Sequence, residues 1–382
     1  MIYADWAADA PVCDSAKAAI LCGMEICGNS SSVHSAGISA RAVIEKAREA
    51  VSALIGCDAD EVYFTSGGTE ADNLAVIGGY EYAKHELGRT AIVTSTIEHA
   101  AVLKPVRYLE SRGADVRYVD AAERDASGEV TGRVLARDFA DKIEGAGLVC
   151  LMYANNETGT VQPIREVVEI AHAAGAIVFC DAVQAVGHVK IDVRELGVDM
   201  LSLSGHKFGS PGGIGALYVR RGIEIPPMML GGGQERGLRS GTHPTMMISA
   251  LGAACTEANE NMTREDEVRA LRDDIARELL AIDGAHRNGS AEYVLPGVIN
   301  ISFDGVGGEE LMNLCGLRGV CVSTGSACHS GNGVASEVLL SMGFDPDRAL
   351  GAIRISIGST TTESDAREIV RTVRESVNLI RG

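Results

Sequence analysis

Two residues that follow or end hydrophobic segments carry side chains suited to amine and acid chemistry. Lys207 follows the segment 200–205 and precedes a glycine-rich run, whereas the other six lysines lie in polar or helical surroundings. A partly desolvated lysine has a lowered pKa and can form a Schiff base. Asp181 lies near the end of the apolar segment 176–182. Open α/β sheets place ligands at the carboxyl ends of their strands, although many such aspartates only cap the next helix.

A glycine turn at residues 66–69, Ser-Gly-Gly-Thr, separates a strand pattern from a helical pattern. Glycine lets backbone N–H groups approach an anion, and a helix N-terminus favours negative charge. The turn matches neither nucleotide-binding glycine motif, and an ordinary strand–helix turn explains it equally well. Together with Asp181 and Lys207, however, it completes the set that pyridoxal phosphate (PLP) requires: a phosphate turn, an acid for the ring nitrogen and a lysine.

Alternating strand and helix patterns position these residues. Strand patterns occur at 61–65, 91–95, 116–120, 148–154, 176–182, 200–205 and 215–219, and helical patterns at 36–55, 70–78 and 164–174. This alternation predicts an α/β domain with a mostly parallel sheet.

The pattern changes near residue 245. A long helical stretch at 245–282 is followed by strands at 298–303 and 352–358 and helices at 307–317 and 363–380. We therefore predict a large domain formed by residues 13–247 and a smaller α+β domain formed by residues 1–12 and 248–382.

Composition excludes several classes of protein. The 382 residues include 34 basic and 52 acidic side chains, a net charge of −18, and the pI is about 4.9. This charge argues against direct binding of nucleic acid or an anionic membrane. The first residues do not resemble a signal peptide, and no apolar run approaches a membrane span of ~20 residues. We expect a cytoplasmic protein whose ten cysteines are thiols, with no C-x-x-C pair and no metal site.

Nine segments, in order, resemble the cysteine desulfurases of the NifS/IscS type, a class V PLP-dependent family close to the selenocysteine lyases. The segments are 28–37, 64–73, 98–102, 154–164, 181–187, 202–220, 231–242, 323–330 and 353–358. One such segment is modest evidence, but nine in order are specific. The resemblance implies PLP fold type I, in which a mostly parallel seven-stranded sheet is flanked by helices and a smaller α+β domain is attached.

The resemblance also implies a role for each matching residue. Lys207 would carry PLP as a Schiff base, Asp181 would protonate the ring nitrogen, and His99 would stack on the ring. The remaining implied residues are Gln184 and Asn156 at the ring oxygen; Gly68, Thr69, Ser204 and His206 at the phosphate; Thr242 from the second subunit of a homodimer; and Arg354 and Asn29 at the substrate.

Cys328 lies in a glycine- and serine-rich segment, S-T-G-S-A-C-H-S-G-N-G, whose composition predicts a mobile loop. In the family this cysteine attacks the sulfur of PLP-bound substrate and leaves as a persulfide, which requires a thiolate. We interpret Cys315 and Cys321 as packing residues. The implied reaction converts L-cysteine to L-alanine, with Lys207 moving the α-proton. The sulfur would pass to an acceptor such as an iron–sulfur scaffold protein, or to tRNA thiolation.

The match has departures, and other functions stay open. Asp9-Ala10 replaces a Thr-Thr pair near the substrate, where the new carboxylate either alters substrate fit or is an exposed turn residue. Ser30 replaces a proline, which we expect to loosen its loop. The alternative functions are selenocysteine lyase, a class V aminotransferase, which the cysteine of the loop disfavours, and a non-catalytic sulfur carrier, which the intact Lys207, Asp181 and Cys328 disfavour.

Overall fold

A seven-stranded sheet forms the centre of the computed structural model, which describes residues 1–324 and 335–382. Its order is β2-β8-β7-β6-β5-β3-β4, and only β8 runs antiparallel to its neighbours. The strands are β2 (Val62–Thr65), β3 (Ala91–Ser95), β4 (Asp115–Val119), β5 (Ala146–Cys150), β6 (Ile177–Asp181), β7 (Met200–Ser204) and β8 (Gly215–Val219). The predicted α/β fold with a mostly parallel sheet is confirmed, and every predicted strand of this sheet is present.

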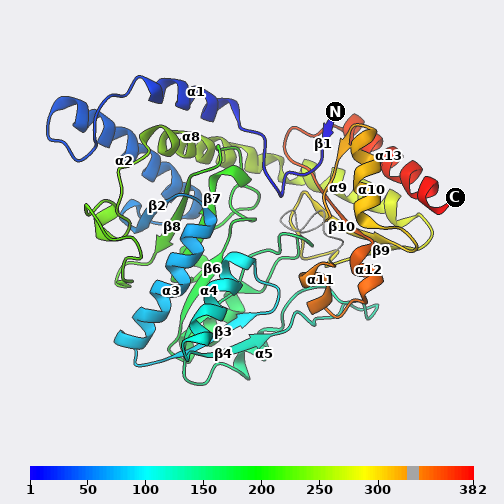
Figure 1. Ribbon diagram of the computed structural model, residues 1–382, viewed down its shortest axis with the longest axis horizontal. Helices are drawn as coiled ribbons and strands as arrows, with labels where there is room; N and C mark the ends of the chain where they lie inside the picture. The colour runs from blue at the N-terminus through cyan, green and yellow to red at the C-terminus, as the bar shows by residue number, and fades with distance from the viewer. Residues whose placement is uncertain (325–334) are drawn as a thin grey trace.

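Helices cover both faces of this sheet (Figure 1). One face packs against α3 and α4, and the other packs against α2, α6 and α8. From the N-terminus to residue 261, the α-helices are α1 (Asp14–Met24), α2 (Ser35–Ile55), α3 (Gly68–Glu86), α4 (Ala100–Ser111), α5 (Ala136–Ala140), α6 (Ile164–Ala173), α7 (Val193–Leu196) and α8 (Thr245–Asn261).

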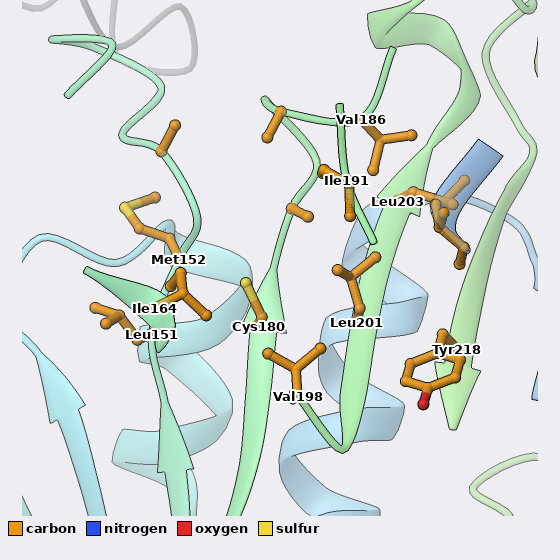
Figure 2. Close-up of a cluster of buried hydrophobic side chains, with 14 of the residues drawn as sticks. Leu151, Met152, Ile164, Cys180, Val186, Ile191, Val198, Leu201, Leu203 and Tyr218 are labelled. Atoms are coloured by element: carbon orange, nitrogen blue, oxygen red, sulfur yellow. The ribbon is translucent and has the colours of Figure 1, made fainter. Parts of the chain in front are cut away.

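Burial on both faces explains why the strands read as continuous apolar runs rather than alternating ones. In β6, Ile177 and Phe179 point to the α3 face, whereas Val178 and Cys180 point to the α2 face. Figure 2 shows part of the latter core, where Cys180 lies near Leu201. Every residue of β6 and β7 is buried, so the polar side chains that end these strands are held on a rigid support.

A smaller α+β unit follows α8. An antiparallel sheet of order β12-β10-β9 contains β9 (Ala285–Arg287), β10 (Val298–Phe303) and β12 (Ala352–Ser356), and β1 (Ile2–Tyr3) pairs in parallel with β11 (Val320–Cys321). Its helices are α9 (Glu265–Leu280), α10 (Gly308–Leu317), α11 (Glu337–Ser341), α12 (Pro346–Leu350) and α13 (Glu363–Arg381). A separate apolar core joins α9 and α13 to this sheet.

The prediction of one continuous helix at 245–282 is wrong, because the structure has two helices there. A 3₁₀ turn, Met262–Arg264, separates α8 from α9. Three acidic residues, 265–267, open α9, and negative charge in a first turn favours a new helix N-terminus. The predicted domain boundary at 247/248 stays a prediction. Because α8 packs on α1 and α2, we propose the turn at 262–264 as the point where the chain passes into the small unit.

Candidate active site

The carboxyl ends of the parallel strands bring the predicted site residues together. Asp181 ends β6 and Ser204 ends β7, while β2 leads through Ser66 and Gly67 into α3. His99 follows β3 and is the N-cap of α4. Parallel strands end at one edge of the sheet, which is where open α/β sheets bind ligands.

Lys207 lies in the 3₁₀ turn Gly205–Lys207 that follows β7. Its Nζ donates to the backbone oxygens of Ala7 and Ala8, at 2.8 Å each. Burial, with a further contribution from the Arg354 guanidinium, lowers the pKa of Lys207 to about 8. An appreciable fraction of this amine is therefore unprotonated near neutral pH, as a Schiff-base lysine requires.

Three buried acids, Asp181, Asp72 and Glu98, interact with one another at this edge of the sheet. Asp181 Oδ1 accepts a hydrogen bond from the backbone N of Val183, at 2.9 Å, and burial raises the pKa of Asp181. Ligand atoms of Asp72, His99 and Asp181 all lie within 4.8 Å of one another. Burial, followed by repulsion from Asp181, raises the pKa of Asp72, and burial raises that of Glu98 to about 8. The site therefore concentrates buried carboxyl groups, for which a cation in hydrogen-bond contact is a natural partner.

His99 is neutral and has a defined tautomer. Burial lowers the pKa of His99. Its Nδ1 accepts from the backbone N of Ala101, at 3.1 Å, so the proton of the neutral ring lies on Nε2. Between α3 and α4, a cavity of about 430 Å³ opens beside this ring. Its lining includes Thr69, Asn73 and Lys104.

The N-terminus of α3 forms the predicted phosphate turn. Gly67, the N-cap, has φ of 150°, a conformation that glycine adopts most readily. A Cβ on Gly215 of β8 would lie 2.8 Å from the Gly67 Cα, so this close approach requires glycine at position 215. Thr69 is exposed in the first turn of α3, and Ser204 Oγ lies 2.9 Å from Nδ1 of His206. The first-turn N–H groups and hydroxyls fit an anion such as a phosphate.

An N-terminal segment, residues 5–10, crosses the site and joins it to the small unit. Asp5 Oδ1 forms an ion pair with Arg354 Nη2 at 2.7 Å. Arg354 Nη1 donates to the backbone oxygen of Asn156, also at 2.7 Å. Gln184 Nε2 donates to the backbone oxygen of Ala7 at 3.0 Å. The segment therefore contacts both the residue proposed to carry PLP and the residue proposed to bind substrate.

The structure brings together most predicted site residues. Around Lys207 it gathers the residues expected at the ring, the phosphate and the substrate carboxylate: Asp181, Gln184, Asn156, His99, Gly68, Thr69, Ser204, His206 and Arg354. Thr242 and Asn29 are exposed instead. The only contact described for the Asn29 side chain is with the backbone N of Ser31, at 2.9 Å. Cys328 lies outside the described residues.

Sequence reasoning missed four residues at this site: Asp5, Asp72, Glu98 and Asn155. Asn155 Oδ1 accepts from the backbone N–H groups of residues 157 and 158, which shapes the turn that presents Asn156. Glu98 Oε1 accepts from Ser95 Oγ at 2.5 Å and from the backbone N of Met152 at 3.0 Å. Glu98 and Asn155 could have been found because each is a polar residue beside an apolar segment of the sequence. Asp5 could have been found because it begins the Asp-x-Ala motif near the start of the chain.

Comparison with known proteins identifies the class. A model of the family "Aminotransferase class-V" matches residues 2–369, and the chain belongs to this family. Members bind PLP on a lysine, and the half-buried Lys207, the strand-end acid Asp181 and the turn at α3 fit that cofactor.

Within the family, the chain groups with the cysteine desulfurases of the IscS and NifS type, as the sequence resemblance indicates. It is 39% identical over 382 residues to "Cysteine desulfurase IscS" of Methanosarcina thermophila, covering 100% of this chain and 93% of that protein. A solved "NifS-like protein" is 34% identical, with a TM-score of 0.90 and 99% of each chain covered. The structure of "SspA in complex with cysteine" is 33% identical, with a TM-score of 0.80, covering 94% of this chain and 99% of that one.

Proposed function

We propose that this protein is a PLP-dependent cysteine desulfurase that converts L-cysteine to L-alanine and retains the sulfur on Cys328. The observation that carries the proposal is the half-buried amine of Lys207, whose pKa is about 8 and which interacts electrostatically with an arginine, Arg354, and a strand-end acid, Asp181. The family and the curated relatives support the proposal, since these relatives are named cysteine desulfurases.

Four residues hold the cofactor ring in this proposal. Asp181 receives the ring N–H, which places a cation against its buried carboxyl group. His99, neutral and with its proton on Nε2, covers the ring face, and Gln184 with Asn156 faces the ring oxygen. When bound, PLP withdraws electrons from the α-carbon of an attached amino acid. Lys207, once displaced by the substrate amine, takes the α-proton, and its pKa of about 8 suits an acid–base group near neutral pH.

Arg354 binds the substrate carboxylate. Its planar fork matches a carboxylate in two-point contact. Arg354 is buried in β12 and already pairs with Asp5 through Nη2. The substrate carboxylate therefore joins an arginine whose orientation Asp5 fixes, which limits the rotational freedom lost on binding.

Cys328 accepts the sulfur. This assignment comes from the resemblance of the segment 323–330 to the family, since the residue lies outside the described part of the chain. The thiolate would attack the substrate sulfur as the bond between that sulfur and the substrate β-carbon breaks. The bonding electron pair stays with the substrate carbon, which takes up a proton to become alanine, and the persulfide stays on the enzyme. The sulfur then passes to an acceptor protein, such as an iron–sulfur scaffold, or to a pathway of tRNA thiolation.

The functional unit is a homodimer in this proposal. Large apolar side chains are exposed on α1, on the loop after it and on the segment between β8 and α8: Leu21, Met24, Val33, Met228, Met229 and Leu230. Exposed apolar residues concentrated on one region favour a protein interface. The segment between β8 and α8 lies at the opposite end of the molecule from α13 (Figure 1). We also propose a cytoplasmic location; no described helix is long and apolar enough to cross a membrane.

Alanine release from L-cysteine under a mild reductant tests the proposal. Wild type should bind PLP and release alanine and sulfide in equal amounts. Lys207→Ala should abolish both products, and Cys328→Ala should abolish them while visible PLP absorption remains. Cys321→Ala is the matched control, because that thiol lies at the paired strand β11, and it should leave turnover within about twofold of wild type. Turnover of L-selenocysteine but not L-cysteine would contradict the proposal.

A further inference from the structure

Two exposed residues, Asn29 and Thr242, lie outside the site around Lys207, and a chain of partly buried hydrogen bonds links their sequence neighbours. Ser30, next to Asn29, is buried, and its Oγ lies 2.9 Å from Nδ1 of His243, next to Thr242. Nε2 of the same imidazole lies 2.7 Å from Oε1 of Glu235. Neighbours of both exposed residues are thus joined through one ring.

The direction of the hydrogen bond between His243 and Glu235 follows from the Glu235 carboxylate. Arg48 Nη1 and Nη2 donate to its two oxygens at 2.8 and 2.9 Å, and the backbone N of Phe64 donates at 2.7 Å. Although burial opposes ionisation, the hydrogen bonds from Arg48 and His243 lower the pKa of Glu235 to about 2. An ionised carboxylate only accepts, so Nε2 of His243 donates to it. On the other side of the ring, Nδ1 and the Ser30 hydroxyl are hydrogen-bond partners at 2.9 Å.

The segment that carries Thr242 is fixed at further points. Arg239 Nε donates to Glu70 Oε1 at 2.7 Å, and Glu70 Oε2 accepts from the backbone N of Ser66 at 2.8 Å. This pair ties the segment to the phosphate turn of its own chain. Glu235 and Arg236 both have positive φ, 49° and 54°, a conformation that a non-glycine residue keeps only where its surroundings enforce it.

Thr242 is nevertheless exposed between Arg239 and His243, both of which are held by the surrounding contacts. A rigid support with an exposed hydroxyl is suited to a ligand outside its own chain. Ser30 stands where the family that the sequence resembles has proline. Proline stiffens a loop by fixing φ and has no side-chain donor. Here a buried hydroxyl contacts His243, so Ser30 gives the loop an anchor that proline lacks, and the looser loop expected from the substitution stays a prediction.

We propose that Ser30 and His243 are positioning residues that hold Thr242 against the cofactor phosphate of a second copy of this chain. The inference rests on the proposed function, because it requires PLP and a dimer. Glu235 and Arg48 anchor the imidazole, and the hydroxyl of Ser30 sets the rotation of the ring. Ser30 therefore acts on the phosphate only through Thr242.

A double-mutant cycle tests this proposal, with the rate of PLP dissociation from the dimer as its readout. Ser30→Ala should speed dissociation about threefold to tenfold, since the half-buried Nδ1 of His243 loses its partner. In a Thr242→Ala background the same change should have no further effect, because its target is gone. Ser31→Ala is the matched control, from an exposed neighbouring serine, and Ser30→Thr, which keeps the hydroxyl, should restore the wild-type rate.

Mixed dimers show which site the serine serves. One chain carries Lys207→Ala, so only the other chain holds PLP covalently. Ser30→Ala placed on the Lys207→Ala chain should speed PLP dissociation, whereas Ser30→Ala on the PLP-bearing chain should not. Equal effects from both placements, or additive effects in the double-mutant cycle, would overturn the proposal. A wild-type chain that binds no PLP would instead refute the proposed function. Thermal unfolding of each variant reports whether it folds.

Discussion

The pKa of Lys207 sets how fast the cofactor-free protein captures PLP. The amine attacks only when unprotonated. With a pKa of about 8, roughly a tenth of Lys207 is unprotonated at pH 7, whereas a lysine at the ordinary value of 10.5 has only about three molecules in ten thousand in that form. Lys207 should therefore react about 300-fold faster at pH 7 than an equally nucleophilic exposed lysine.

The assay is the rate at which stripped protein regains the visible absorption of bound PLP between pH 6 and 10. The reaction rate of free Nα-acetyl-lysine with PLP, measured in parallel and expressed per unprotonated amine, corrects for the ionisation of PLP itself. Because the reactive form is the unprotonated amine, the corrected rate should rise with pH and level off above about pH 8. A rate that keeps rising to about pH 10, as for an ordinary lysine, would refute the argument from burial.

A charge change beside the site tests the electrostatic part of this argument. Asp9 is exposed and follows Ala8, whose carbonyl accepts from Lys207, and the Asp9 carboxylate raises the pKa of Lys207. Asp9→Thr removes that charge, so the midpoint of the rate profile should move below its wild-type value. Asp141→Thr, an exposed aspartate after α5, should leave it unchanged. A midpoint that rises in Asp9→Thr would contradict the sign of the effect.

Three further predictions concern buried charges. Asp5→Asn should lower kcat/KM for L-cysteine about threefold to tenfold, mainly through KM, because Arg354 loses the partner 2.7 Å away that orients it; an unchanged KM in steady-state kinetics would count against this role. Arg48→Met should lower the free energy of unfolding by about 3–5 kcal/mol in urea titrations, since Glu235 is left buried without its two-point partner; a loss below 1 kcal/mol would contradict it. Glu98 has a pKa of about 8 in the fold against an ordinary 4.5, so the unfolded chain releases this proton at lower pH than the folded chain does. The stability contributed by Glu98 therefore falls as pH rises from about 4.5 to 8. Glu98→Gln should flatten that part of the plot of unfolding free energy against pH, and an unchanged slope would show that Glu98 is not the group responsible.

Much of the fold was predictable because its signals are local. The strands β5, β6 and β7 are buried on both faces, so each appears in the sequence as an apolar run ending in polar or glycine residues. The break between α8 and α9 was missed because both sides of it have helical composition. Strand β1 was missed because it has two residues and pairs with β11, more than 300 residues away, which no local pattern reveals.

Site residues were predictable where the required chemistry needs a residue type that is rare in this chain. Lys207 follows a buried strand, and the chain has few other lysines, so its identity alone was informative. Asp5 and Glu98 were missed because their roles depend on distant partners, Arg354 and the backbone of Met152. The contact between Ser30 and His243 was not predictable because the two residues lie far apart along the chain.

The most direct test of the central claim is mass mapping of the enzyme after one exposure to L-cysteine without reductant. The account predicts one added sulfur atom per chain, located on the peptide that contains Cys328, together with one alanine released. This label should be absent from Lys207→Ala. Alanine release with no added sulfur on Cys328, or sulfur on another cysteine in the wild type, would contradict the account.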